Sequence, residues 1–189
     1  MNPFAAVIEI VLSFYTSIVL LRFFLQYFRA DFYNPISQLV VKATDPLVKP
    51  LRKIIPGFGG LDISSIILAW LVIIAKFLLV SLLSGGMGSI NIIVLLFGSI
   101  FGVVYAALNL YMFLIFVRAI LSWFAMSTGP SPVMLVFAQL TEPLLARIRR
   151  MLPPMEGFDL SPMLALLGLF FVKSSISYYI EPLVGGLLL

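Results

Sequence analysis

Two lysines interrupt long apolar stretches of the sequence, and they stand 97 positions apart. Lys76 and Lys173 each follow an aspartate by 14 residues, about 21 Å along an apolar helix. Glu9 and Asn109 lie in two other apolar stretches. Ionisable groups inside a bilayer often line an ion or proton path. The simpler interpretation is that both lysines extend to nearby headgroups or form fixed pairs, such as Glu9 with Lys76.

Two arginines stand one to two helical turns before the ends of apolar stretches. Arg22 could reach Asp45, and Arg118 could reach Glu142, because each carboxylate lies in the segment that follows. Either arginine could instead bind a lipid phosphate. Arginines at this depth usually anchor a span at the membrane interface. We interpret both as anchors, with a substrate site as the alternative.

The segments that connect the apolar stretches are the most charged parts of the chain. Each places apolar residues and cations at helical spacing, which predicts a helix with a basic face and an apolar face. Such a helix suits the headgroup plane, where a well-placed cation contributes about 1 kcal/mol to binding anionic lipid. The candidate lipid- or partner-binding residues are Lys49, Arg52, Lys53, Arg147, Arg149 and Arg150.

The sequence contains no Cys and no His. Disulfides, thiolate nucleophiles, acid–base catalysis by His and most zinc or haem ligation are therefore excluded. The sequence also has no recognisable nucleophile–base pair or phosphate-binding loop. We predict that the protein is not an enzyme, with no catalytic residues, no metal site and no cofactor, and we expect no nucleic-acid partner.

The composition indicates a membrane protein. Of the 189 residues, 62% are hydrophobic and 11% are charged, and the mean hydropathy is +1.15. Soluble domains have about 25% charged residues, so this chain has too few charges to cover a water-exposed surface. Four apolar runs are long enough to cross a hydrocarbon core of about 30 Å. They span 4–28, 61–83, 90–124 and 160–180 and predict an all-α fold with four transmembrane helices.

Two linkers, 34–56 and 131–153, are predicted to be amphipathic helices that lie at the interface or re-enter the membrane. In the first linker, Thr44-Asp45-Pro46 is expected to break the helix and start another, because a residue before proline is displaced from the helical region. Asp45 would then cap the second helix. Asp62 and Asp159 are expected to cap the spans that follow the linkers.

The chain contains an internal repeat. Residues 34–65 align without a gap to 131–162, with nine identities in 32 pairs. This similarity predicts two parallel repeats, 1–84 and 90–189, each with two spans and one linker. The motif residues are Pro35, Thr44, Asp45, Pro46, Pro56 and Asp62 in the first copy and Pro132, Thr141, Glu142, Pro143, Pro153 and Asp159 in the second.

The distribution of cations predicts the orientation. The segments 29–60 and 125–159 hold eight Lys and Arg residues, whereas 1–3, 84–89 and 182–189 hold none. By the positive-inside rule, both linkers are expected to face the cytoplasm and both termini the periplasm of a bacterial inner membrane.

The pattern (N/S)P…T(D/E)PL…R…P…G.D.S, present twice, resembles the YggT family, also called YlmG. The resemblance covers essentially the whole chain. It implies a small integral membrane protein of the inner membrane or thylakoid without established enzymatic activity. Relatives have been associated with osmotic or potassium stress tolerance, with cell division and nucleoid distribution, and with assembly of b-type cytochromes. This chain departs from an exact repeat where Pro50 becomes Arg147 and Gly57 becomes Pro154.

Two functional hypotheses follow from these features. The first is a non-enzymatic organiser or assembly factor whose basic linkers bind anionic lipid headgroups or an unidentified membrane protein. The second is a small ion channel or transporter subunit built on Glu9, Lys76 and Lys173, with Asn109 nearby. Because four spans enclose little space, the second hypothesis requires a homo-oligomer.

Overall fold

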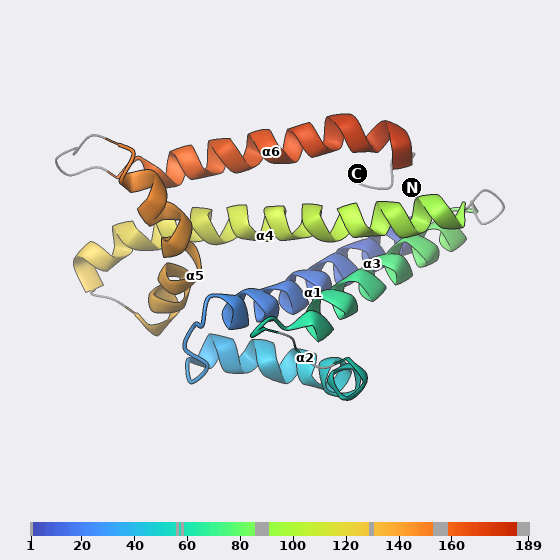
Figure 1. Ribbon diagram of the computed structural model, residues 1–189, viewed down its shortest axis with the longest axis horizontal. Helices are drawn as coiled ribbons and strands as arrows, with labels where there is room; N and C mark the ends of the chain where they lie inside the picture. Colours follow the sequence, from blue (N-terminus) through green and yellow to red (C-terminus); the bar gives the residue numbers. More distant parts are fainter. Residues whose placement is uncertain are drawn as a thin grey trace.

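The computed structural model describes residues 2–55, 57, 59–85, 91–128, 131–152 and 159–184. These residues form six helices, and the predicted all-α class is confirmed (Figure 1). The helices are α1 (Pro3–Tyr27), α2 (Pro35–Ile54), α3 (Ile63–Leu83), α4 (Ile92–Thr128), α5 (Pro132–Arg149) and α6 (Ser161–Val184).

Four of these helices are long and apolar enough to cross a membrane, as predicted. The candidate spans are Pro3–Tyr27, Ile63–Leu83, Ile92–Ser122 and Ser161–Pro182. The remaining helices, α2 and α5, occupy the predicted linkers. The assignment of these elements to two repeats, and their orientation in the membrane, stay predictions.

The helices are arranged in layers. Figure 1 shows α6 beside α4, with α1 and α3 on the other side of α4 and α2 beyond them. The helices α1 and α4 run in one direction, and α3 and α6 run in the other. Helix α5 crosses one end of α4 and α6, and α1 begins and α6 ends at the opposite end of the bundle. The spans α1 and α4 finish at the same end of the bundle, so α2 and α5, which follow them, both lie at that end.

Both linker helices contribute to the hydrophobic core. Val40 and Val48 of α2, and Val136 and Leu140 of α5, are buried in the cluster that α1, α3 and α4 also build. A buried aliphatic side chain contributes roughly 1.5–3 kcal/mol. These contacts therefore hold the linkers against the spans.

The predicted break at Thr44-Asp45-Pro46 is wrong. Helix α2 continues through it with Pro46 and Pro50 inside, and α5 likewise contains Pro143. A proline inside a helix costs about 3 kcal/mol. In α2, full burial of Thr44 and Val48 beside the proline offsets this cost. Figure 1 shows the first turns of α2 crossing the view and its last turns end-on, so the helix bends along its length.

The two aspartates before α3 and α6 bind the starts of these helices. Asp62 is the N-cap of α3 and accepts from the Ser65 amide at 3.4 Å and its hydroxyl at 2.7 Å. Asp159 accepts from the Ser161 amide at 2.9 Å. Each contact satisfies a backbone donor that the first helical turn leaves free.

Candidate functional site: the charged linker helices and a polar cavity

A buried arginine fixes the first linker helix to the first span. The Arg22 side chain is only 7% exposed. Its guanidinium donates to the Thr44 hydroxyl at 2.8 Å and to the Asp45 carboxylate at 2.7 Å. A charge this deep in a protein must be paired and hydrogen-bonded. Arg22 therefore reaches Asp45, as its sequence position suggested, and joins α1 to α2.

A second carboxylate lies at the centre of the same cluster. The Asp62 side chain is fully buried and lies 2.7 Å from the Arg52 guanidinium and 3.5 Å from Arg22 Nε. Two cations and the Ser65 hydroxyl thus compensate one buried charge. We call Arg22, Thr44, Asp45, Arg52 and Asp62 the first charge cluster; it ties together α1, α2 and the start of α3.

Lys49 extends this cluster toward the surface. Its ammonium lies 2.8 Å from the second oxygen of Asp45, one helical turn away, and the lysine side chain is 71% exposed. The hydrogen bond from Lys49, together with Arg22 and against the effect of burial, lowers the pKa of Asp45 below its ordinary value. Asp45 is therefore ionised at neutral pH and bridges an inner and an outer cation.

The second linker carries an equivalent cluster. Arg118 donates to the Thr141 hydroxyl at 2.9 Å and to the Glu142 carboxylate. Arg149 then bridges Glu142 at 3.0 Å and Asp159 at 2.7 Å. We call these five residues the second charge cluster. They occupy the motif positions that correspond to the first cluster and join α4, α5 and the start of α6.

The second cluster is more open than the first. The side chains of Glu142 and Asp159 are both 43% exposed. Partial burial alone would raise the pKa of Glu142, but hydrogen bonds and charges from Arg118 and Arg149 outweigh it and lower that pKa. Ser161 and Arg149 likewise outweigh burial and lower the pKa of Asp159. Both carboxylates are thus ionised at neutral pH in the folded protein.

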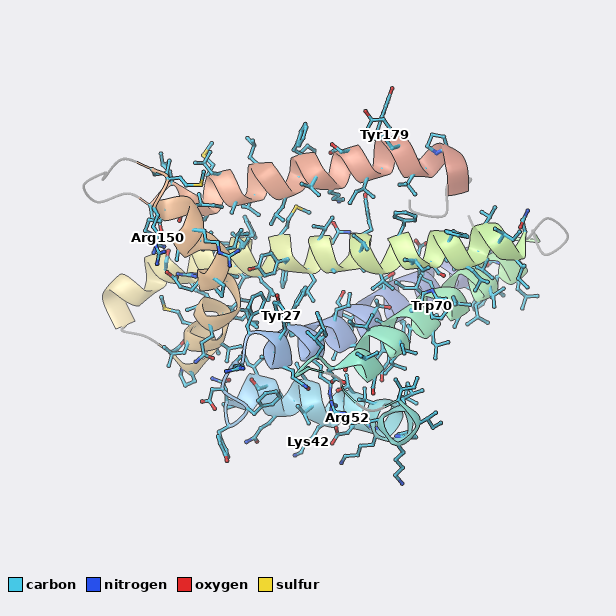
Figure 2. All side chains as sticks on the ribbon, in the orientation of Figure 1. Tyr27, Lys42, Arg52, Trp70, Arg150 and Tyr179 are labelled. Carbon is cyan, nitrogen blue, oxygen red and sulfur yellow. The ribbon has the colours of Figure 1, made fainter. Side chains whose placement is uncertain are left out.

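The six cations proposed to bind lipid or a partner fall into two groups. Arg52 and Arg149 are hydrogen-bonded within the charge clusters, and Lys49 pairs with Asp45. Lys53, Arg147 and Arg150 are exposed and lie within 4 Å of no described carboxylate; the same holds for Lys42. Figure 2 shows Lys42 on the side of α2 that points away from the bundle.

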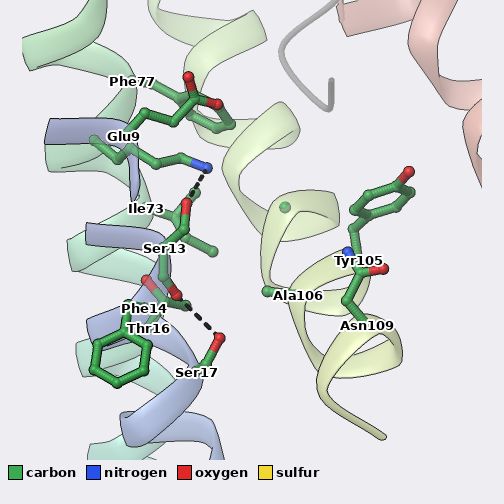
Figure 3. A pocket seen from close by; sticks show the side chains of 12 residues that line it. Glu9, Ser13, Phe14, Thr16, Ser17, Ile73, Phe77, Tyr105, Ala106 and Asn109 are labelled. Carbon is green, nitrogen blue, oxygen red and sulfur yellow. Dashed lines mark hydrogen bonds between the residues drawn. The ribbon is translucent and has the colours of Figure 1, made fainter. Parts of the chain in front are cut away.

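Three of the polar residues predicted to lie within the membrane line a cavity between α1, α3 and α4. This cavity of about 370 Å³ is lined by Glu9, Ser13, Lys76, Tyr105 and Asn109, among others (Figure 3). The Lys76 ammonium donates to the Ser13 hydroxyl at 3.3 Å. Within the described part of the chain, Glu9 and Lys76 form no ion pair within 4 Å, so the proposed direct pair is replaced by the serine contact.

Lys173 approaches the same cavity from the opposite side of α4. Its ammonium lies 4.7 Å from the centre of the Tyr105 ring, and Tyr105 also lines the cavity. This is a cation–π contact. The structure thus brings Glu9, Lys76 and Asn109 together at one cavity and places Lys173 behind Tyr105.

The motif prolines that the structure describes lie either at the first residue of a linker helix or inside it. Pro35 and Pro132 are the first residues of α2 and α5, after the N-caps Asn34 and Ser131. This is the helical position that tolerates proline best. The Asn34 amide also donates to the Pro132 carbonyl at 2.6 Å and joins the two linkers. Pro46 and Pro143 lie inside the helices, and Pro56 and Pro153 lie outside the described residues.

The sequence analysis did not predict several hydrogen bonds and ion pairs that motif residues form in the charge clusters. It did not connect Thr44 and Thr141 with the arginines, or Arg52 with Asp62. The signal was present, because these positions are identical in the two copies. When a unit is duplicated, residues that bind one another within it should be retained in both copies. Polar residues that are identical in the two copies could therefore have been predicted to contact one another.

Among the described residues, no group of three or more Asp, Glu, His or Cys side chains could hold a metal ion. The polar features of the described residues include two charge clusters, several exposed cations and the polar cavity around Lys76. The two clusters join helices.

Known proteins resemble this chain over most of its length. A family model described as CCB3/YggT matches residues 1–83 and 97–180. An uncharacterized protein encoded in the proC 3′ region of Vibrio alginolyticus is 40% identical over 184 residues, covering 97% of this chain and 98% of that protein. An uncharacterized Pseudomonas aeruginosa protein is 46% identical over 158 residues, covering 83% and 79%.

The uncharacterized protein YggT of Escherichia coli K12 is 36% identical over 190 residues, covering 100% of this chain and 96% of that protein. No solved structure matches the chain. The family match and these relatives agree with the pattern that occurs twice in the sequence and with its four apolar helices. The chain belongs to the CCB3/YggT family of membrane proteins.

Proposed function

We propose that this protein is a non-enzymatic membrane organiser whose linker helices present cations to anionic lipid headgroups or to an acidic membrane partner. The observation that carries the proposal is the division of the cations between paired and exposed positions. Four arginines, two from the spans and two from the linkers, lie in the charge clusters that hold α2 and α5 against the spans. Lys42 and Lys53 of α2, Arg147 of α5 and Arg150 directly after α5 remain exposed.

The exposed side of α2 has the composition of an interfacial helix. Lys42, Lys49 and Lys53 fall at i, i+7 and i+11 and share one stripe. Leu39 and Ile54 lie on the neighbouring stripe and are 67% and 77% exposed. A helix with cations beside exposed apolar side chains fits the boundary between headgroups and acyl chains. The composition of this face favours contact with lipid over contact with bulk water.

The exposed part of α5 has a similar combination. Arg147 and Arg150 are exposed, and Leu135 on the same helix is 53% exposed. Each cation near an anionic surface contributes about 1 kcal/mol. The positive-inside rule favours a cytoplasmic position for both linkers, where the inner leaflet supplies anionic headgroups. We therefore place this face at the cytoplasmic surface of the inner membrane.

The test compares two sets of substitutions in the full chain, solubilised in native nanodiscs. The first set is Lys42→Gln, Lys53→Gln, Arg147→Gln and Arg150→Gln together. The matched control keeps every charge, with Lys42→Arg, Lys53→Arg, Arg147→Lys and Arg150→Lys. Lipids and proteins retained with each variant are identified by mass spectrometry.

We expect the Gln set to lose the enrichment of anionic lipid, or of an acidic partner, that the wild type and the charge-keeping control retain. Membrane insertion and thermal stability should stay near wild type, because none of these cations pairs within the described fold. Equal retention by all three proteins would contradict the proposal.

The polar cavity supports a second candidate, a homo-oligomeric ion conduit. Glu9, Ser13 and Lys76 line about 370 Å³ of space between apolar helices, and a cavity with polar walls can hold ions or water. Ion flux into proteoliposomes should then fall in Lys76→Met and stay unchanged in Lys42→Met, which removes an exposed linker cation. Absence of flux through the wild-type protein would exclude this candidate.

A further inference from the structure

An apolar groove separates the two halves of the bundle at the end where α5 lies. It has a volume of about 540 Å³ and opens between α1, α4 and α5. It follows the line along which α1 and α4 touch, and its lining includes Leu20 and Phe24 of α1, Phe28 directly after α1, and Val103, Ala107 and Tyr111 of α4. Because these apolar residues come from both halves, the groove exists only where the halves meet.

The walls of this groove are held in place by specific contacts. The Tyr111 ring stacks on Phe28 with 6.1 Å between ring centres and meets Phe24 edge-on at 5.6 Å. The Tyr111 hydroxyl donates to the Leu140 carbonyl of α5 at 3.1 Å. Aromatic pairs and a satisfied hydroxyl fix these side chains. The groove is therefore preformed.

A single cation lines the groove. Arg147 of α5 is exposed, and no described carboxylate lies within ion-pairing distance of its guanidinium. Its neighbour Arg149 is instead bound by Glu142 and Asp159. Arg147 thus offers an uncompensated positive charge beside an apolar channel, which is complementary to an anionic amphiphile.

The dimensions of the groove fit part of an acyl chain. The lining residues run from Phe28 to Leu20 and from Tyr111 to Val103, which is about 12 Å along two helices of the same direction. Arg147 adds a positive charge to this apolar lining, and an apolar chain that carries a phosphate is complementary to both.

We infer that this groove is a binding site for an anionic phospholipid, with its phosphate on Arg147 and one acyl chain lying along the line where α1 and α4 meet. This inference rests on the proposed function, because it names one discrete lipid site within the face that α2 and α5 present. It differs from a general attraction to the membrane surface, since both the charge and the shape of the groove select the ligand.

The experiment titrates the purified full chain in detergent with phosphatidylglycerol or phosphatidylcholine and measures bound lipid by native mass spectrometry. Arg147→Gln should weaken phosphatidylglycerol about fivefold. Arg150→Gln, which removes the same charge from the exposed face outside the groove, should weaken it less than Arg147→Gln does. Val104→Trp, which fills the groove from a side chain that is 41% exposed, should weaken both lipids.

The control for the filled groove is Ile100→Trp, one turn away on α4 and 50% exposed but not in the groove. It should bind both lipids like the wild type. If Val104→Trp does not fold, Leu144→Trp fills the groove from α5 and is expected to give the same result.

Failure of this inference is distinguishable from failure of the proposed function. If Arg147→Gln and Arg150→Gln weaken phosphatidylglycerol equally and the groove-filling variant has no effect, the groove inference is overturned and a diffuse cationic face stands. If the wild type does not prefer phosphatidylglycerol, both are overturned. A disulfide between two Val104→Cys chains would assign the groove to a second copy and would also overturn the inference.

Discussion

The two charge clusters use matching motif residues but differ in how deeply they lie. In the first cluster Asp62 is fully buried and both Arg22 and Arg52 approach it. In the second, Asp159 is 43% exposed and binds Arg149, and no described contact joins it to Arg118. The same pattern of residues thus yields a buried junction in one half and a half-open one in the other.

The packing of the following span explains this difference. In the most apolar part of each span, 22% of the residues are buried in α1 and α3, but only 6% in α6. Helix α3 packs on α1, α2 and α4, whereas α6 packs on α4 and α5. Helix α6 has fewer packed neighbours than α3, and its aspartate is correspondingly more exposed, although Ser161 is itself buried. The energetic value of equivalent ion pairs should consequently differ between the halves.

The largest expected effect should come from replacing the arginines that join each span to its linker, Arg22 and Arg118. Arg22→Met leaves Asp45 and Asp62 with a missing partner, which typically costs about 3–5 kcal/mol for a buried pair. Arg118→Met should cost about 1–2 kcal/mol, because Glu142 is partly solvated and keeps Arg149. Reversible unfolding in one detergent measures both. Equal losses would show that the difference in burial has no energetic consequence.

A smaller difference is expected between the coupling energies of the two arginine–aspartate pairs that join each linker helix to the next span. A double-mutant cycle on Arg52 and Asp62 should give a coupling energy of about 1–3 kcal/mol, since the carboxylate has no contact with solvent. The matching cycle on Arg149 and Asp159 should give about 0.2–1 kcal/mol, as for exposed pairs. Denaturant unfolding of each single and double variant supplies the energies; the reverse order would contradict the comparison.

The spans and the linkers could be predicted from sequence because apolar length and helical spacing are local properties. All four runs and both linker helices are where the sequence places them, and Asp62 is the N-cap that was expected. The continuity of α2 through Pro46 was not predictable in this way. It depends on the burial of Thr44 and Val48 against other helices, which local rules for proline do not contain.

The candidate site could be predicted only in part, for a related reason. The sequence offered the pairing of Arg22 with Asp45 and of Arg118 with Glu142 as a possibility, because each carboxylate lies in the segment that follows, but it favoured an anchoring role for both arginines. It counted Arg52 and Arg149 among the cations available to lipid, although both are engaged by aspartates that begin the next helix. Which cations stay free depends on how α3 and α6 return to the linkers, and that is a tertiary property.

The pH dependence of stability should sharpen the comparison further. The folded-state pKa values of Asp45, Glu142 and Asp159 are lowered, so their pairs stabilise the protein above the unfolded-state pKa values near 4. This stability is lost as pH falls through the lowered values, because the unfolded state then binds more protons. The second cluster contributes two of these groups and the first contributes one.

Glu142→Gln should therefore lower stability at pH 7 by less than about 1 kcal/mol, since the group is exposed to solvent, and should reduce the loss on acidification. Thermal unfolding between pH 7 and pH 3 measures this slope. Asp31→Asn, which removes one negative charge at an exposed position outside both clusters, controls for a general change in charge. An unchanged acid slope in Glu142→Gln would show that its ion pairs do not contribute to acid unfolding.

The smallest expected effect concerns the outermost cation of the first cluster. Lys49 pairs with Asp45 across one helical turn, whereas the corresponding position in the second linker is Ala146. Exposed pairs of this spacing contribute about 0.3–0.5 kcal/mol and are weakened by salt. Lys49→Ala should lower stability by this amount, and Ala146→Lys should raise it by a similar amount by pairing with Glu142. Unfolding at low and high ionic strength tests both, because an effect that survives high salt would have to come from packing and not from the ion pair.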